Sequence, residues 1–361
     1  MSLQLLIVGC GAVAQRLYRK PLQQLEKRGL LQVAALVDPA TENANALRAF
    51  FTKAKIYDNL ENAFAESKLD ITLVLSPAHL HFEHVVQALR NYSHVLCEKP
   101  MALSADDCAR MNAVATETDH ILAIGMIRRF FPAYQQFKQM MCDGKLGSLV
   151  SFEYREGHKF EWDVTTSVAF RPRMCGGTGV LFDIGPHVVD YLTWLFGDLK
   201  VPAYADDAIS GIESNVSLEI ESHFCRGSIH LSWDCPQSNE LRVLGSKGEA
   251  VLRVDRFDQL AVRTTSDYEL QKIPISFPTD TLRQAQSYMS PKSYVEAIYC
   301  QLVQMMRAIK WGEPPAVDGL EGEKCIFLLE SALSVACPLD MPWLERSEEE
   351  AFRRMHWKNN S

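Results

Sequence analysis

The chain has 361 residues, which exceeds one ordinary domain and favours two. Hydrophobic residues make up 47% of it and charged residues 23%, as in a typical globular protein. The formal net charge is 37 minus 45, or −8, and no segment is rich in Lys and Arg. A nucleic-acid-binding surface needs a basic face, so we expect no nucleic-acid partner.

Cysteine usage favours a reducing compartment. The ten cysteines are scattered, and no two stand at the C-x-x-C spacing of a zinc or redox site. The segment His79–His84, HLHFEH, also lacks the H-E-x-x-H and H-x-x-E-H spacings of zinc helices. We therefore expect a cytoplasmic protein that holds no metal ion.

The stretch Leu5–Ala14, LLIVGCGAVA, has two interpretations. Its apolar residues before Cys10 fit the cleavage pattern of a bacterial lipoprotein. A signal peptide needs a basic start, however, and no Lys or Arg precedes Arg16. The sequence also lacks the run of about 20 apolar residues that a membrane span requires. We expect a soluble protein with no membrane partner.

Residues 1–125 alternate between short apolar runs and amphipathic segments. We expect strands at Leu5–Val8, Val33–Val37, Ile71–Leu75, His94–Cys97 and Ile121–Ile124. We expect helices near 12–27, 41–53, 79–91 and 104–118. Such alternation predicts an α/β fold with a doubly wound parallel sheet, the Rossmann domain.

Residues 126–361 have a different pattern. Helices are expected at Ala133–Cys142, Pro186–Phe196, Pro291–Trp311 and Gly322–Cys337. Strands are expected at Leu149–Arg155, Val216–Ser222, Arg226–Trp233, Glu240–Gly245 and Glu249–Val254. Successive strands joined by short turns predict an open, mostly antiparallel sheet in a second α/β domain.

The turn after the first expected strand fits a dinucleotide pyrophosphate. Gly9 allows a tight turn, Gly11 lets the backbone approach the phosphates, and Ala14 allows close packing of helix and strand. Ala12 and Val13 complete this turn, at the N-terminus of a helix whose dipole attracts anions.

Asp38 ends the second expected strand, where an acid can accept hydrogen bonds from the ribose hydroxyls of the adenosine. Its charge would repel the 2′-phosphate of NADP, and no Arg follows nearby. We therefore expect NAD as the cofactor, with NADP less favoured. A turn aspartate before Pro39 is the alternative interpretation of this residue.

Two further segments carry polar residues suited to catalysis. Glu98 and Lys99 follow the fourth expected strand, at the carboxyl edge where ligands bind. Asp183 and His187 are four residues apart, so on a continuous helix they share one face. If Pro186 instead begins the helix, His187 lies at its N-terminus, where neutral imidazole is favoured. A purely structural histidine is the alternative.

The sequence resembles the glucose-fructose oxidoreductase, inositol dehydrogenase and rhizopine-catabolism (Gfo/Idh/MocA) family of oxidoreductases. The motifs that carry the resemblance, in chain order, are the turn at 9–14, Ser76-Pro77 with His81, Glu98-Lys99-Pro100, Arg128-Arg129-Phe130-x-Pro132 and Asp183-x-Gly185-x-His187-x-x-Asp190. One departure is Ser76, which stands where threonine is frequent.

The resemblance implies a role for each matched position. Lys99 would hydrogen-bond the reacting oxygen, His187 would exchange the hydroxyl proton, and Asp183 would orient Lys99 or the substrate. Ser76, His81 and Glu98 would line the cofactor cleft. The C-terminal sheet would form a homodimer or homotetramer.

We expect an NAD-dependent dehydrogenase that acts on a secondary alcohol of a sugar, cyclitol or sugar derivative. One alternative is an NAD-assisted lyase or glycosidase with no net redox change, and another is a non-catalytic NAD-binding sensor. The candidate substrate-binding residues are Arg129, His158, Trp162 and Arg171.

Overall fold

The computed structural model describes residues 2–161, 177–208, 212–267, 269–275, 291, 293–341 and 345–360, with side chains up to Met355. The chain divides into two compact units. The N-terminal unit comprises 1–130, 163–165 and 285–326, and the C-terminal unit comprises 131–162, 166–284 and 327–361. Residues 285–326, far along the chain, thus belong to the N-terminal unit in addition to the expected residues 1–125.

The N-terminal unit contains a six-stranded parallel sheet of order β3-β2-β1-β4-β5-β6. Its strands are β1 (Leu3–Val8), β2 (Leu31–Val37), β3 (Lys55–Tyr57), β4 (Ile71–Val74), β5 (His94–Cys97) and β6 (Leu122–Ile124). This is the Rossmann strand order, and it confirms the expected fold. Since β1 has β2 on one side and β4 on the other, the strand order reverses at β1.

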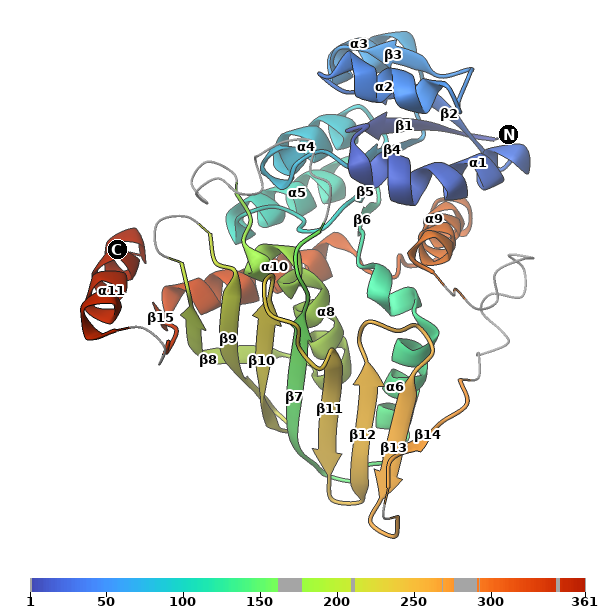
Figure 1. The fold of residues 1–361 in the computed structure, drawn as a ribbon. Coiled ribbons are helices and arrows are strands. Elements are labelled where there is room, and N and C mark those ends of the chain that lie inside the picture. The colour runs from blue at the N-terminus through green and yellow to red at the C-terminus, as the bar shows by residue number, and fades with distance from the viewer. Residues whose placement is uncertain are drawn as a thin grey trace. The chain divides into compact units, whose positions relative to one another are not determined.

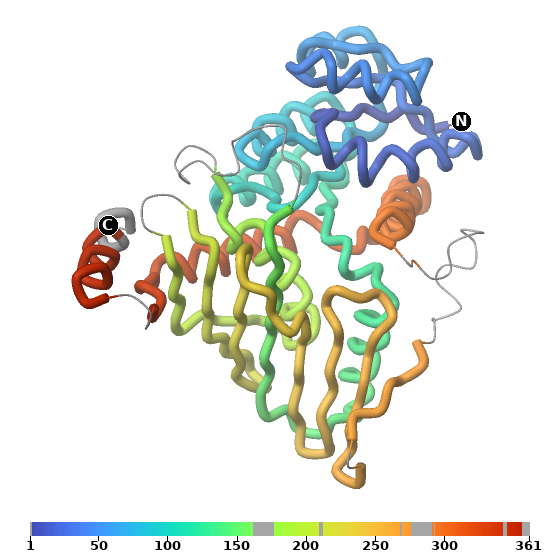
Figure 2. The backbone as a smooth tube through the Cα atoms, viewed as in Figure 1, coloured from blue at the N-terminus to red at the C-terminus, as the bar shows by residue number. Residues whose placement is uncertain are grey.

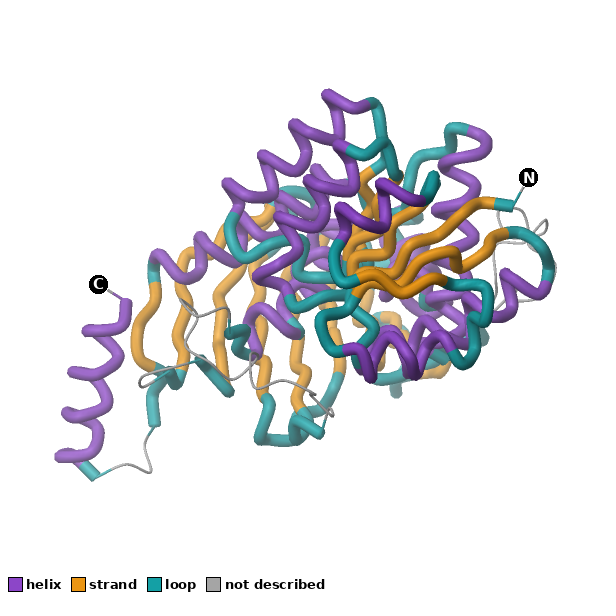
Figure 3. Tube along the Cα trace, turned by 90° about the horizontal axis from the view of Figure 1, so that it is seen from above, coloured by secondary structure: helices purple, strands orange, loops and turns teal. Residues whose placement is uncertain are grey.

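Helices lie on both faces of this sheet (Figure 3). They are the π-helical turn Ala14–Tyr18 with α1 (Arg19–Lys27), α2 (Thr41–Arg48), α3 (Leu60–Glu66), α4 (His81–Arg90) and α5 (Ala105–Thr118). Helix α9 (Tyr294–Trp311) packs against α1. The side chains of Asn59 and Ser104 accept N–H bonds at the starts of α3 and α5. The short elements β3 and α3 were not expected from the sequence.

The C-terminal unit contains a nine-stranded sheet of order β14-β13-β12-β11-β7-β10-β9-β8-β15 (Figure 1). Its strands are β7 (Leu149–Gly157), β8 (Leu199–Asp206), β9 (Asn215–Ser222), β10 (Arg226–Ser232), β11 (Glu240–Gly245), β12 (Gly248–Arg253), β13 (Leu260–Thr264), β14 (Gln271–Lys272) and β15 (Ala336–Pro338). The neighbours pair antiparallel except β7 with β10 and β8 with β15. The mostly antiparallel sheet is confirmed.

The helices of this unit are α6 (Pro132–Cys142), α7 (Val180–Asp183), α8 (Gly185–Phe196) and α11 (Arg346–Asn360). Helix α10 (Gly319–Ser334) continues from the N-terminal unit into this one. Gly197 has a φ of +77° and ends α8 where the sequence predicted a stop. The expected helix to Cys337 was wrong, because residues from Ala336 pair with β8 as strand β15.

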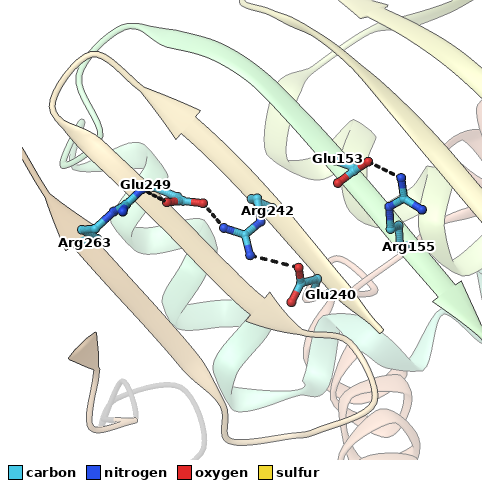
Figure 4. A network of polar contacts seen from close by, with 6 residues as sticks. All are labelled: Glu153, Arg155, Glu240, Arg242, Glu249 and Arg263. Atoms are coloured by element: carbon cyan, nitrogen blue, oxygen red, sulfur yellow. Dashed lines mark hydrogen bonds and ion pairs between the residues drawn. The ribbon is translucent and has the colours of Figure 1, made fainter. Parts of the chain in front are cut away.

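The two faces of the C-terminal sheet differ in chemistry. Phe152 and Tyr154 on β7 face Val243 and Leu241 on β11, and all four are buried. The opposite face carries alternating acidic and basic side chains, which form the ion pairs Arg155–Glu153, Arg242–Glu240, Arg242–Glu249 and Arg263–Glu249 (Figure 4). The run of hairpins from β11 to β13 can be followed in Figure 2.

Candidate active site

Gly9 follows β1 in a conformation that only glycine adopts without strain. Its φ is +89°, and a Cβ atom would lie 2.6 Å from the backbone of Leu75 and Ser76. The Gly9 N–H also donates to the Val37 carbonyl at 2.9 Å. The absence of a side chain therefore keeps the ends of β1, β2 and β4 close together, at the point where the strand order reverses.

The next residues open a helix directly from this turn. Ala12 and Val13 are helical, and the N–H of Gln15 donates to the Gly11 carbonyl at 3.0 Å. Ala14 is buried against the sheet, while Gly11, Ala12 and Val13 are partly exposed. A helix N-terminus with small, accessible residues presents backbone N–H groups and positive dipole to an anion such as a pyrophosphate.

Asp38 lies beside the same turn. Its Oδ2 accepts the Cys10 N–H at 2.7 Å, and its Oδ1 accepts the Ala40 N–H at 2.8 Å. These bonds hold the carboxylate at the end of β2 and partly exposed. A carboxylate has about four lone-pair sites, so Asp38 can accept further bonds from a ligand's hydroxyl groups.

Ser76 and His81 connect the ends of neighbouring strands. The Ser76 Oγ lies 2.8 Å from Nδ1 of His84. His81 is buried, and its two ring nitrogens lie 2.8 Å from the carbonyl oxygens of Ser76 and Pro100. Burial lowers the pKa of His81 to about 4, although both carbonyls favour the charged ring. A neutral ring has one N–H, so His81 donates to one of these two carbonyls while it lies between the loops after β4 and β5.

Glu98 and Lys99 leave the carboxyl end of β5. The Glu98 N–H donates to the Val74 carbonyl at 2.9 Å, and the Lys99 N–H donates to Oε2 of Glu98 at 3.1 Å. The Lys99–Pro100 peptide bond is cis. Both side chains are partly exposed. The geometry leaves Lys99 at the carboxyl edge of the sheet, where ligands of open α/β sheets bind.

Asp183, at the end of α7, and His187, in the first turn of α8, form the exposed face of this helical segment of the C-terminal unit. Of the residues Val180–Leu192, these two are partly exposed and the others are buried. The linking residue Ile184 is itself helical, with φ −86° and ψ −38°, so the four-residue spacing keeps both side chains on one side. Asp190, three residues further on, is buried.

Two residues that the sequence analysis missed fix this segment. The indole Nε1 of Trp233 donates to Oδ2 of Asp183 at 3.1 Å. The buried Glu213 accepts the Leu181 N–H at 3.0 Å, and a Cβ on Gly179 would lie 2.2 Å from its carboxyl carbon. Trp233 was expected only as the end of a strand, and a contact across 50 positions leaves no local sequence pattern.

The four candidate substrate-binding residues are placed differently. Arg129 is buried in the N-terminal unit, where its guanidinium binds the Ala316 carbonyl at 2.9 Å and Glu321 at 2.8 Å. His158 is exposed at the end of β7. Trp162 and Arg171 lie outside the described residues. Lys99 belongs to the N-terminal unit, whereas Asp183 and His187 belong to the C-terminal one.

Two negative findings concern the described part of the chain. No group of three or more His, Cys, Asp or Glu side chains there is arranged to hold a metal ion. Among the same residues, no helix combines the length and the hydrophobicity needed to cross a membrane.

The Rossmann sheet and the glycine turn define a dinucleotide-binding oxidoreductase fold. Residues 3–126 match the family described as oxidoreductases with an NAD-binding Rossmann fold. Residues 134–251 match the C-terminal domain of the same family. The chain therefore belongs to the Gfo/Idh/MocA oxidoreductase family.

Among curated proteins, the D-glucoside 3-dehydrogenase of Escherichia coli is 28% identical over 198 residues, which is 54% of each chain. The inositol 2-dehydrogenase of Ralstonia nicotianae is 28% identical over 207 residues, covering 56% of this chain and 57% of its own. The chain thus spans about half the length of the curated relatives it matches.

Solved structures share the whole fold. A levoglucosan dehydrogenase in complex with NADH and levoglucosan superposes with a TM-score of 0.81 at 17% identity, covering 93% of this chain and 97% of its own. KijD10, a 3-ketoreductase from Actinomadura kijaniata in complex with NADP and TDP-benzene, superposes with a TM-score of 0.78 at 18% identity, covering 95% of this chain and all of its own.

Proposed function

We propose that the protein is an NAD-dependent dehydrogenase that acts on a secondary alcohol, or the corresponding ketone, of a sugar, cyclitol or sugar derivative. The observation that carries the proposal is the Gly9 turn, in which neighbouring backbone excludes any side chain and a helix N-terminus follows at once. The names of the E. coli and Ralstonia relatives support the substrate class.

The catalytic residues that we propose are Lys99, Asp183 and His187. The Lys99 ammonium would donate a hydrogen bond to the reacting oxygen and stabilise negative charge there. The His187 imidazole would take the hydroxyl proton during oxidation and return it during reduction. Asp183, held by Trp233, would orient the substrate hydroxyl or Lys99. When bound, the nicotinamide supplies the acceptor or donor of the hydride.

The cofactor-binding residues that we propose are Gly9, Gly11, Ala12, Val13, Ala14, Asp38, Ser76, His81 and Glu98. The family comparisons include proteins with NADH and with NADP, so the choice between the two rests on Asp38. Its carboxylate, fixed by two backbone N–H groups, would accept bonds from ribose hydroxyls and repel a 2′-phosphate. His81 would contribute from its position between the loops that carry Ser76 and Glu98.

For the substrate-binding side, we retain His158, Trp162 and Arg171. Arg129 is also retained, although it is buried and its Nη1 binds Glu321 and the Ala316 carbonyl. We also propose a homodimer or homotetramer that forms through the C-terminal sheet, whose charged face offers both signs to a second copy. The described cysteines are free thiols, which suits the proposed cytoplasmic location.

A fluorescence titration of the purified chain with NADH, and separately with NADPH, tests the cofactor part of the proposal. We expect tight NADH binding and weaker NADPH binding. Sugars and cyclitols are then screened as substrates by the absorbance of NADH, because NADH must accumulate during oxidation. Binding of neither cofactor would overturn the proposed function, whereas a preference for NADPH would overturn only the role of Asp38.

A further inference from the structure

Three polar side chains from distant segments of the N-terminal unit form a chain of hydrogen bonds. The amide Nε2 of Gln301, on α9, donates to the Tyr18 hydroxyl at 3.1 Å. The Tyr18 hydroxyl donates to Oε1 of Glu98 at 2.6 Å. Tyr18 has no exposed surface and Gln301 is 4% exposed, so both donors are shielded from water, whereas Glu98 is partly exposed. A short bond from a buried donor to a carboxylate is stronger than the same bond in water.

With the Gln301 amide oriented as in the structure, the order of donors makes Glu98 an acceptor. An amide NH₂ group can only donate, so the Tyr18 oxygen accepts from Gln301 and its single proton points to Glu98. The other carboxyl oxygen of Glu98 accepts the Lys99 N–H at 3.1 Å. Both oxygens of Glu98 therefore act as acceptors, as in a carboxylate.

The carboxyl group of Glu98 is also confined by packing. A Cβ on Gly125, which follows β6, would lie 3.1 Å from the carboxyl carbon of Glu98. The group thus lies above the carboxyl ends of β5 and β6. A dinucleotide in this fold crosses the edge of the sheet at the reversal of strand order, here β1. With the adenosine at Asp38 beyond β2, the nicotinamide half falls on the side of β4 to β6.

We propose that Tyr18, supported by Gln301, is a positioning residue that keeps Glu98 a carboxylate beside the nicotinamide and so favours the oxidised over the reduced cofactor. This inference rests on the proposed function. The physical reason is charge: the oxidised nicotinamide ring carries a positive charge and the reduced ring carries none. A fixed negative charge nearby therefore stabilises the oxidised form selectively.

Groups from each surrounding segment act on Glu98. The pKa of Glu98 is raised overall, because burial outweighs the Tyr18 hydrogen bond and the Lys99 charge and N–H, which lower it. Cys97 precedes Glu98 on β5, and burial, together with Glu98 itself, raises the pKa of its thiol. Burial and the charge of Glu98 also raise the pKa of Tyr18. Cys97 and Tyr18 therefore remain neutral, and Lys99 is the charged group beside Glu98. Loss of the Tyr18 hydroxyl would remove one of the interactions that lower the pKa of Glu98, so this pKa would rise further.

The test is Tyr18→Phe, with the dissociation constants of NAD⁺ and NADH measured by titration between pH 5.5 and 9. The ratio Kd(NAD⁺)/Kd(NADH) should rise as the pH falls, because protonated Glu98 no longer attracts the oxidised ring. Loss of one hydrogen bond to a carboxylate raises its pKa. The rise should therefore begin at a higher pH in Tyr18→Phe than in wild type, so that the ratio of the variant exceeds that of wild type at intermediate pH.

Tyr57→Phe is the matched control, because the Tyr57 hydroxyl donates to a different carboxylate of the same unit, Glu66, at 3.2 Å. It should leave the ratio unchanged. Glu98→Gln should give a ratio that no longer depends on pH and equals the low-pH limit of wild type. If Tyr18→Phe does not fold, Gln301→Leu serves instead and should move the ratio in the same direction.

An unchanged pH profile in Tyr18→Phe and Gln301→Leu would overturn the inference. A pH dependence of the ratio that persists in Glu98→Gln would also overturn it, because a group other than Glu98 would then be titrating. The Oε1 of Gln301 has no hydrogen-bond partner in the described structure, and a reversed amide would instead accept from Tyr18. Glu98 would then be protonated, and the wild-type ratio would equal that of Glu98→Gln, which would overturn the inference. Failure of wild type to bind either cofactor would refute the proposed function instead.

Discussion

The indole of Trp233 donates its N–H to the carboxylate of Asp183, at 3.1 Å, from the residue that follows β10. Trp233 is 6% exposed, and its ring packs against Phe160 with 4.8 Å between ring centres. A rigid, packed donor of this kind fixes the direction of a carboxylate on a neighbouring helix. Asp183 is thus positioned by a residue that itself need not contact the substrate.

Trp233→Phe should lower kcat/KM about tenfold, because a hydrogen bond to a charged acceptor contributes about 1.5–3 kcal/mol and phenylalanine keeps only the packing. The affinity for NADH should remain near that of wild type. Steady-state kinetics with the best substrate from the screen provide the measurement. Trp194→Phe, in the same unit, is the control and should retain full activity. Equal kinetics in both variants would remove Trp233 from the site.

Gly9→Ala should abolish NADH binding. The new methyl group would lie 2.6 Å from the backbone of Leu75 and Ser76, and φ at this position is +89°. The turn must shift to relieve this contact, which displaces the N–H groups that face a pyrophosphate. Gly29→Ala is the control, because Gly29 has a φ of +68° and open space around it. It should lose some stability but bind NADH normally in the same titration.

Asp38→Asn should shift the preference from NADH towards NADPH by about tenfold, since it removes the negative charge that repels a 2′-phosphate. The asparagine cannot accept both the Cys10 and the Ala40 N–H, so the absolute affinity for NADH should also decline. Parallel titrations with both cofactors give the ratio. The exposed Asp58, changed to Asn, controls for net charge. A ratio that stays constant would show that Asp38 is a turn residue only.

Sequence pattern predicted the parts of the site that depend on local geometry. Gly9 and Asp38 each follow a buried strand. Pro186 lies in the first turn of α8, as one of the two interpretations of the sequence had it, and this places His187 near the N-terminus of that helix, with Asp183 at the end of α7. The strands β1, β2, β4, β5 and β6 were found because buried parallel strands are continuous apolar runs. Strand β3 was missed because it has three residues, of which Lys55 is exposed.

Contacts between distant residues could not be predicted in this way. Tyr18 and Glu98 are 80 positions apart, and Arg129 reaches Ala316 over 187. The charge of Arg129 suggested a substrate contact, but its burial and its partner Glu321 depend on tertiary packing. Strand β15 likewise exists because β8 offers a free edge, and its residues Ala336–Pro338 contain no strand pattern of their own.

The stability of the protein should fall between pH 7.5 and pH 5 in part through His81. Its pKa is about 4 in the folded state and about 6.5 in an unfolded chain. The unfolded state therefore binds the proton first as the pH falls, and the stabilisation by neutral His81 is complete only above about pH 6.5. Over this interval the loss amounts to ~2 kcal/mol of unfolding free energy.

His81→Gln should reduce this pH dependence by that amount, because the glutamine side chain does not titrate. Urea unfolding at both pH values measures the difference. His223→Gln, at an exposed position, should keep the full dependence. If His81→Gln keeps it too, the partly buried His84 and His94, whose pKa values burial also lowers to about 4, account for it instead.

Lys99→Ala and His187→Ala should each reduce turnover by about 10²–10⁴-fold, because the first removes the donor to the reacting oxygen and the second removes the proton acceptor. Both should bind NADH within about twofold of wild type, since neither belongs to the pyrophosphate turn or the adenosine site. Lys55→Ala and His223→Ala remove exposed side chains of the same types and should turn over normally. Wild-type turnover in both Lys99→Ala and His187→Ala would refute the assigned roles, even with NADH binding intact.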